Sequence, residues 1–155
     1  MRAPVVTVFW PNDGITNVSV YWDTHARNFI DLSTRLCPVT DRAFAALLDD
    51  LNDRRMLDET PILWTGEMGR TPRVGQSVVG GTGAAADGRD HWPKVFTSVM
   101  AGGGIRGGAV YGASDRYAAE PACFADFSSH GLQRVLEFGD DRKVVANVQS
   151  SETCQ

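Results

Sequence analysis

An aspartate and a histidine stand two positions apart at Asp23 and His25, directly after a run of β-branched and aromatic residues. In an extended strand, residues i and i+2 project from the same face, so both side chains can point beyond the strand end. A carboxylate oxygen beside an imidazole nitrogen suits zinc or a similar divalent metal. Taken alone, such a pair is more often a capped strand end with a solvated histidine than a metal site.

Further ligands would have to come from later loops, because a catalytic metal takes about three protein ligands and keeps one position open. The candidates are Glu67, Asp90 and His91, each in a loop that follows an expected strand. Asp90 and His91 are adjacent. It is therefore easier for one to bind the ion while the other orients a ligand from outside than for both to bind.

Two arginines accompany these candidates. Arg70 offers a planar fork that suits phosphate or sulfate oxygens, and Arg89 directly precedes Asp90. Each arginine could instead have a purely structural role. Glu67 and Arg70 could form a surface ion pair worth under about 1 kcal/mol, and Arg89 could pair with Asp90 and only order its loop.

Short elements are expected to position these side chains. β-branched and aromatic residues favour strands, and the expected strands are Val5–Phe9, Thr16–Trp22, Pro61–Thr65 and Val95–Met100. Apolar residues at i, i+3, i+4 and i+7 predict a helix over Asp41–Leu57, with Thr40 as its N-cap. The strand, helix, strand order predicts a parallel α/β unit with its ligands at the carboxyl ends of the strands. A loop of about twenty residues follows Pro72, and loops of that length are usually functional or mobile.

The composition and charge of the chain exclude some classes of binding partner. The 155 residues are 43% hydrophobic and 22% charged, with a net charge of -4, which is typical of one ordinary globular domain. Without a basic patch or an 18-residue apolar span, neither nucleic acid nor a membrane is an expected partner, and the cellular location stays unknown. The cysteines, Cys37, Cys123 and Cys154, are expected to be free thiols.

Four stretches in order, WDTHARNF, DRAFAALLDDLNDRRMLDETPILWTGEMGRTP, GRDHWP and AGGGIRGGAVYGASD, resemble the bacterial DUF1501 family, which is related to the alkaline phosphatase and sulfatase superfamily. The resemblance covers roughly Trp22 to Pro121. It implies an α/β, alkaline phosphatase-like three-layer fold with a mostly parallel sheet. By this resemblance Asp23, His25, Glu67 and His91 are metal ligands, Asp90 is a ligand or its partner, and Arg70 or Arg89 contacts an oxyanion. The ion would be divalent: zinc first, with manganese, calcium or magnesium as alternatives.

The sequence also departs from that pattern. Glu67-Met68-Gly69 stands where superfamily phosphatases tend to carry Asp-His-Gly, so one histidine ligand is missing. Family members usually have a long N-terminal portion, often with a twin-arginine export signal. We therefore expect an incomplete, C-terminal part of the fold over residues 1–121, followed by a divergent tail over 122–155.

Two functions are compatible with these residues. The first is part of a metal-dependent hydrolase for a small phosphate or sulfate ester, inactive by itself, with the missing portion of the fold or a second copy as its partner. The second is a non-catalytic, metal-stabilised binding domain.

Overall fold

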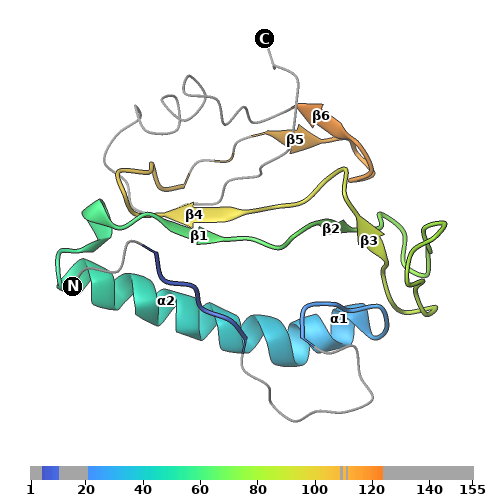
Figure 1. Cartoon of the computed structure of the whole chain (residues 1–155), viewed down its shortest axis with the longest axis horizontal. Coiled ribbons are helices and arrows are strands. Elements are labelled where there is room, and N and C mark those ends of the chain that lie inside the picture. The colour runs from blue at the N-terminus through green and yellow to red at the C-terminus, as the bar shows by residue number, and fades with distance from the viewer. Residues whose placement is uncertain (1–4, 11–20, 109, 111, 124–155) are drawn as a thin grey trace.

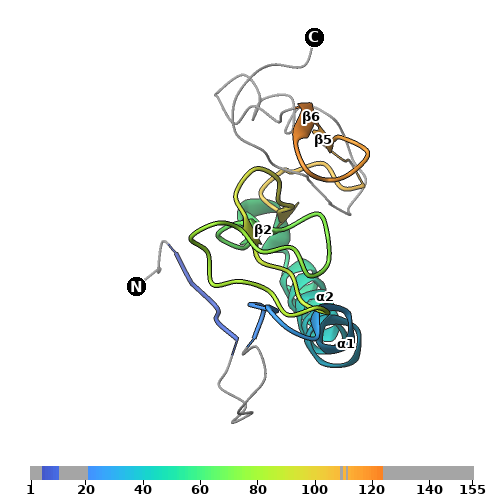
Figure 2. The same cartoon turned by 90° about the vertical axis from the view of Figure 1, so that its right-hand side faces the viewer.

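The computed structural model describes residues 5–10, 21–108, 110 and 112–123. A helical segment lies along one side of the molecule, and a pair of strands, β1 (Ile62–Trp64) and β4 (Val99–Ala101), lies between it and a second pair, β5 (Ala113–Ser114) and β6 (Pro121–Cys123) (Figures 1 and 2). No helix among the described residues combines the length and the apolar character needed to cross a membrane.

The helical segment starts earlier than the sequence predicts. It runs through α1 (Asn28–Asp31), a π-helical turn η1 (Leu32–Leu36) and α2 (Cys37–Asp53). The predicted N-cap at Thr40 is therefore wrong, because Thr40 lies inside α2. The π-helical turn explains how the helix passes Pro38, which has no N–H to donate: Cys37 N–H donates to Leu32 O, five residues back.

The helix ends in a Schellman motif. Met56 N–H donates to Leu51 O at 2.8 Å, and Arg55 N–H donates to Asn52 O at 2.9 Å. Arg55 takes the left-handed position of this motif, with φ 57°. Glycine usually fills that position, because a side chain there costs about 1–2 kcal/mol. A short 3-10 turn, η2 (Leu57–Glu59), follows.

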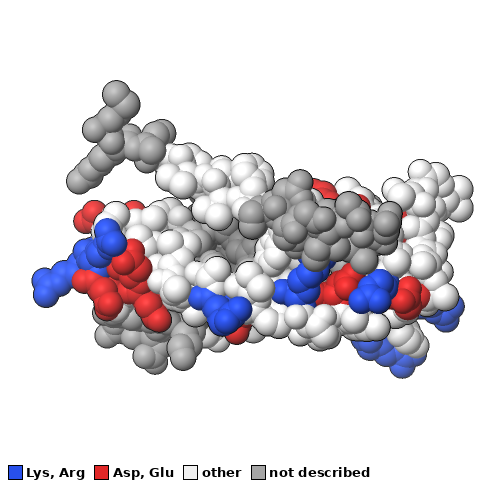
Figure 3. Space-filling model, turned by 90° about the horizontal axis from the view of Figure 1, so that it is seen from below, with Lys and Arg blue, Asp and Glu red and all other residues white. Residues whose placement is uncertain are grey.

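Few apolar residues are buried in the described part of the chain. Leu36 and Ala101 are its buried hydrophobic residues. Trp64 of β1 contacts Phe44 of α2, with ring centroids 5.5 Å apart, and Trp22, with ring centroids 5.9 Å apart. This aromatic contact fixes Trp22, and with it the start of the segment that carries Asp23. On the helical side, acidic and basic side chains adjoin one another (Figure 3).

The observed strand pairs are antiparallel. In β1 and β4, Leu63 lies opposite Met100. β1 confirms the strand expected at Pro61–Thr65, whereas β4 begins only at Val99 rather than at Val95. The strand expected over Val5–Phe9 is wrong, because no described strand pairs with it and Phe9 is 81% exposed.

The expected parallel sheet depends on a strand at Thr16–Trp22. Residues 16–20 lie outside the described part of the chain, and Tyr21 and Trp22 form a turn. The alkaline phosphatase-like three-layer fold therefore stays a prediction, as does the division of the chain at residue 121.

The long loop between Arg70 and His91 is closed at its base. β2 (Gly69–Arg70) pairs with β3 (His91–Trp92), so that Arg70 lies opposite His91. Thr71 N–H donates to Asp90 O at 2.9 Å and continues the closure. Loops whose ends meet in this way are compact rather than extended, and they are frequently functional.

The same loop docks on the chain at the start of α1 and just before it. Three backbone hydrogen bonds join them: Ala85 N–H to His25 O at 2.8 Å, Asn28 N–H to Asp87 O at 3.0 Å, and Arg89 N–H to Thr24 O at 3.2 Å. Gly88 allows this approach, since a Cβ on it would lie 1.7 Å from His25 O. Only glycine fits where two backbones come so close.

Replacing Gly88 by alanine should separate the loop from the His25 segment. Because the added methyl group would overlap backbone atoms rather than a movable side chain, we expect the free energy of unfolding to fall by about 1–3 kcal/mol. Urea unfolding measures this change. Gly66→Ala is the matched control, since the nearest atom to its Cβ would be Met68 O at 3.7 Å. Equal stability of Gly88→Ala and the control would contradict the docking.

Replacing Arg55 by glycine should stabilise the chain. Glycine relieves the left-handed strain but gains freedom in the unfolded state, so the expected rise in the free energy of unfolding is about 0.5–1 kcal/mol. The adjacent Arg54, with φ -81°, provides the control. Arg54→Gly should instead lower the free energy of unfolding by up to about 1 kcal/mol. Thermal unfolding of both variants distinguishes strain relief from a general effect of losing an arginine.

Candidate metal centre

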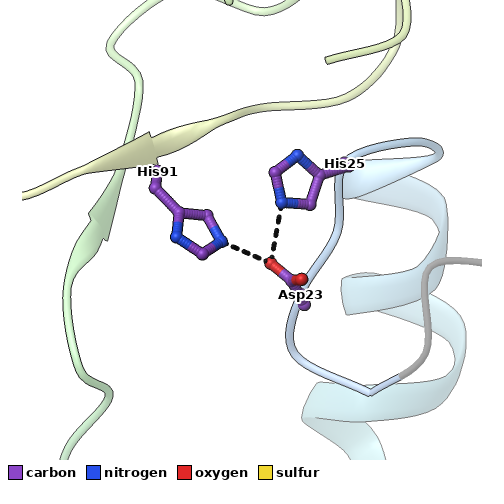
Figure 4. A group of neighbouring side chains, drawn as sticks. All are labelled: Asp23, His25 and His91. Carbon is purple, nitrogen blue, oxygen red and sulfur yellow. Dashed lines mark hydrogen bonds and ion pairs between the residues drawn. The ribbon is translucent and has the colours of Figure 1, made fainter. Parts of the chain in front are cut away.

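Three side chains from distant parts of the sequence meet at one point. Asp23, His25 and His91 each offer a ligand atom, and these atoms lie within 4.8 Å of one another. Asp23 and His25 come from the segment before α1, and His91 comes from β3 (Figure 4). This group contains three of the five residues that the sequence suggested as metal ligands.

Asp23 and His25 converge through a turn rather than along a strand. His25 N–H donates to Asp23 O at 2.9 Å, which closes a three-residue turn. The turn brings His25 Nε2 to 3.0 Å from Asp23 Oδ1. Asp23 and His25 therefore do converge, as the sequence suggested, but through a turn and not through the expected strand.

A backbone carbonyl fixes the orientation of the His25 ring. His25 Nδ1 lies 2.6 Å from Gly83 O, in the docked loop. Because a carbonyl oxygen can only accept, this contact requires the proton on Nδ1. A ring with a single proton, held on Nδ1, carries its lone pair on Nε2, which is the nitrogen that faces Asp23.

His91 approaches the same carboxylate from β3. Its Nε2 lies 2.8 Å from Asp23 Oδ1. The His25 and His91 rings have centroids 4.9 Å apart and are tilted by 32°. Two imidazole Nε2 atoms thus face a single carboxylate oxygen.

Arg70 contributes a positive charge to the cluster. It donates to Asp23 Oδ1 at 2.6 Å and to Trp22 O at 2.9 Å. Partial burial raises the pKa of the Asp23 carboxyl, but hydrogen bonds from His91 and Arg70, together with the charge of Arg70, outweigh it and hold the pKa below its ordinary value. Asp23 is therefore a carboxylate, the form that binds metals.

Asp90 lies outside the group of three. It is fully buried, and its oxygens accept from three backbone N–H groups: Val78 at 2.8 Å, His91 at 2.8 Å and Gly83 at 3.2 Å. These hydrogen bonds, with Val78 the largest contributor, outweigh the effect of burial and lower the pKa of Asp90. Its Oδ1 lies 3.6 Å from His25 Nδ1, on the side of the ring away from the ligand nitrogen.

The other two predicted site residues do not join the cluster. Glu67 is exposed in the bend between β1 and β2, and it is not part of the group of three. Arg89 donates from Nε to Thr71 O at 2.6 Å, so it holds the base of the loop. Burial, and to a smaller extent the charge of Arg70, lowers the pKa of Arg89. Their roles as metal ligand and oxyanion contact stay predictions.

The donor set of Asp23, His25 and His91 fits a divalent ion. Zinc binds imidazole nitrogen and carboxylate oxygen at about 2.0–2.2 Å, which in a tetrahedral site places ligand atoms about 3.4 Å apart. The distances of 3.0 and 2.8 Å from Asp23 Oδ1 to the two Nε2 atoms are near that spacing. Small outward shifts of the side chains, with Arg70 leaving Asp23, would make room for the ion.

Comparison with known proteins gives a family without an assigned activity. No curated protein and no solved structure matches the chain. One family model does match, over residues 2–149, and thus reaches beyond Trp22–Pro121 on both sides. Because that match covers most of the chain, this protein belongs to the family described as Protein of unknown function (DUF1501).

Proposed function

We propose that Asp23, His25 and His91 bind one divalent metal ion, with zinc as the first candidate, in a hydrolase-like protein that acts on phosphate or sulfate esters. The observation that carries the proposal is the convergence of three donor atoms within 4.8 Å. Asp23 and His91 are separated by 68 positions in the chain. Two imidazoles and one carboxylate are the ligand set of several catalytic zinc sites, which leave a fourth position for water or substrate.

The ester class is supported by the chemistry beside the ligands. When bound, a divalent ion would polarise a phosphoryl or sulfuryl oxygen and supply a nucleophile from water. Arg70, released from Asp23 by the ion, would present its planar fork to the remaining ester oxygens. The resemblance to the alkaline phosphatase and sulfatase superfamily points to the same ester class, but by analogy alone.

A non-catalytic, metal-stabilised binding domain is the second candidate. It is favoured by the way the ligands are distributed. An ion would join the segment before α1 to β3, and few apolar residues are buried in the described part of the chain. Metal binding to the folded state alone stabilises a protein by mass action, by about 2.7 kcal/mol at one hundred times the dissociation constant. Such an ion could therefore be retained for stability.

Zinc binding should depend on both histidines. We expect the wild-type chain to bind Zn²⁺ and to unfold at a higher temperature in its presence, and His25→Ala and His91→Ala to lose most of both effects. Because imidazoles must be deprotonated to bind metal, the apparent affinity should fall as the pH is lowered. Chelator competition and thermal unfolding measure these quantities.

The control for zinc binding is Asp49→Asn, which removes an exposed carboxylate of α2. It should bind Zn²⁺ as the wild type does. The assignment of the metal centre is wrong if the wild-type chain neither binds zinc nor is stabilised by it. It is also wrong if both histidine variants bind zinc normally.

Hydrolysis distinguishes the two candidate functions. If the metal centre is catalytic without the portion of the fold that the resemblance predicts to be missing, the zinc-loaded chain should cleave an aryl phosphate or an aryl sulfate. Arg70→Ala should then lower kcat/KM by about 10²–10³, as expected for loss of one group that stabilises transition-state charge. Arg70→Lys should recover only part of the rate, because lysine lacks the fork. A chain that binds and is stabilised by zinc but cleaves neither ester would favour the binding domain over a hydrolase that is active by itself.

A further inference from the structure

We infer that Asp90 is a positioning residue that acts through the backbone of Gly83 and keeps the proton of His25 on Nδ1. The inference deepens the proposed metal site and rests on it for its purpose, since only that tautomer leaves Nε2 free to bind an ion. Asp90 would thus control a ligand of the site without touching the metal.

The backbone of Gly83 links the two side chains. Its N–H donates to Asp90 Oδ2 at 3.2 Å, and its C=O accepts from His25 Nδ1 at 2.6 Å. One residue therefore joins a buried carboxylate to the imidazole. A shift of the Asp90 carboxylate would move the carbonyl that selects the tautomer.

Asp90 has the surroundings of an anchor rather than of a metal ligand. Both of its oxygens already accept hydrogen bonds, Oδ2 from Val78 and Gly83 and Oδ1 from His91 N–H. The side chain is 0% exposed. A carboxylate so enclosed is tolerated only because those donors satisfy it, so the loop around it must keep this conformation.

The position of Asp90 also favours the same tautomer electrostatically. Its Oδ1 lies 3.6 Å from His25 Nδ1, while Asp23 Oδ1 lies 3.0 Å from Nε2. A carboxylate is thus present near each nitrogen, and the two compete for the single proton of a neutral ring. Two further contacts favour the proton on Nδ1: Gly83 O lies 2.6 Å from that nitrogen and can only accept, and Arg70 Nη1 lies 3.5 Å from Nε2 and can only donate.

The test uses two variants of the full chain, each with a matched control. Asp90→Asn removes the charge, and Asp87→Asn removes an exposed carboxylate from the same loop. Gly81→Ala keeps the charge but displaces it, because a Cβ at this position would lie 2.8 Å from Asp90 Oδ2. Gly66→Ala, which has space for its Cβ, is the control.

Two measurements are made on each protein. Long-range ¹H–¹⁵N correlation of the imidazoles in metal-free protein, at a pH where the rings are neutral, reports the His25 tautomer. Chelator competition reports the Zn²⁺ affinity. We expect wild type and controls to hold His25 with its proton on Nδ1. Asp90→Asn and Gly81→Ala should shift it toward Nε2 and weaken zinc binding by about 10–100-fold, as is typical for loss of an outer partner of a ligating histidine.

Three results would overturn the inference. The first is an unchanged His25 tautomer in Asp90→Asn, or in Gly81→Ala if Asp90→Asn fails to fold. The second is an unchanged zinc affinity in a variant whose tautomer has shifted. The third is a loss of affinity in Asp90→Asn as large as in His25→Ala, with an altered Co²⁺ spectrum, which would make Asp90 a ligand. A wild-type chain that binds no zinc would contradict the proposed function instead. The His25 tautomer in the metal-free variants would still decide whether Asp90 is a positioning residue.

Discussion

The close backbone contact between Gly88 and His25 is the constraint on which the site depends. It places the loop before His91 against the segment that follows Trp22, where Ala85 N–H donates to His25 O. Without this docking, His25 and His91 would have no reason to meet, because they come from separate elements. The docking also brings the Gly83 carbonyl to His25. One glycine without a side chain therefore permits both the ligand cluster and its outer contacts.

The types and the order of the residues were enough to identify the candidate ligands, but not to predict how the backbone arranges them. Asp23, His25 and His91 could be selected as candidate ligands because few residue types bind metals and these stand near expected strand ends, but the same signal also selected Glu67 and Asp90, which lie outside the group of three. The convergence of Asp23 and His25 through a tight turn could not be predicted, because the hydrogen bond from His25 N–H to Asp23 O involves backbone atoms alone. The carbonyls of Trp22 and Gly83 were missed for the same reason: a main-chain acceptor has no residue-type signature.

The fold was predictable where local pattern decides it. The apolar spacing predicted the helix, but not its early start, because α1 and the π-helical turn Leu32–Leu36 do not carry that full spacing and continue directly into α2. β1 followed from its apolar run. The segment Val5–Phe9 is also rich in apolar residues yet is no strand, because a strand needs a partner and composition cannot supply one. Pairing direction likewise depends on distant residues, so the parallel sheet remains a prediction.

The charges around Asp23 connect the metal to the proposed substrate. Asp23 Oδ1 already has Arg70 at 2.6 Å, so an ion binding there must displace a guanidinium that is only 18% exposed. That exchange leaves a positive charge without its carboxylate beside a divalent cation, which is unfavourable unless an anion is present. An ester with free phosphoryl or sulfuryl oxygens supplies one. On the proposed function, metal and anion binding should therefore favour each other, because each relieves the charge that the other leaves unbalanced.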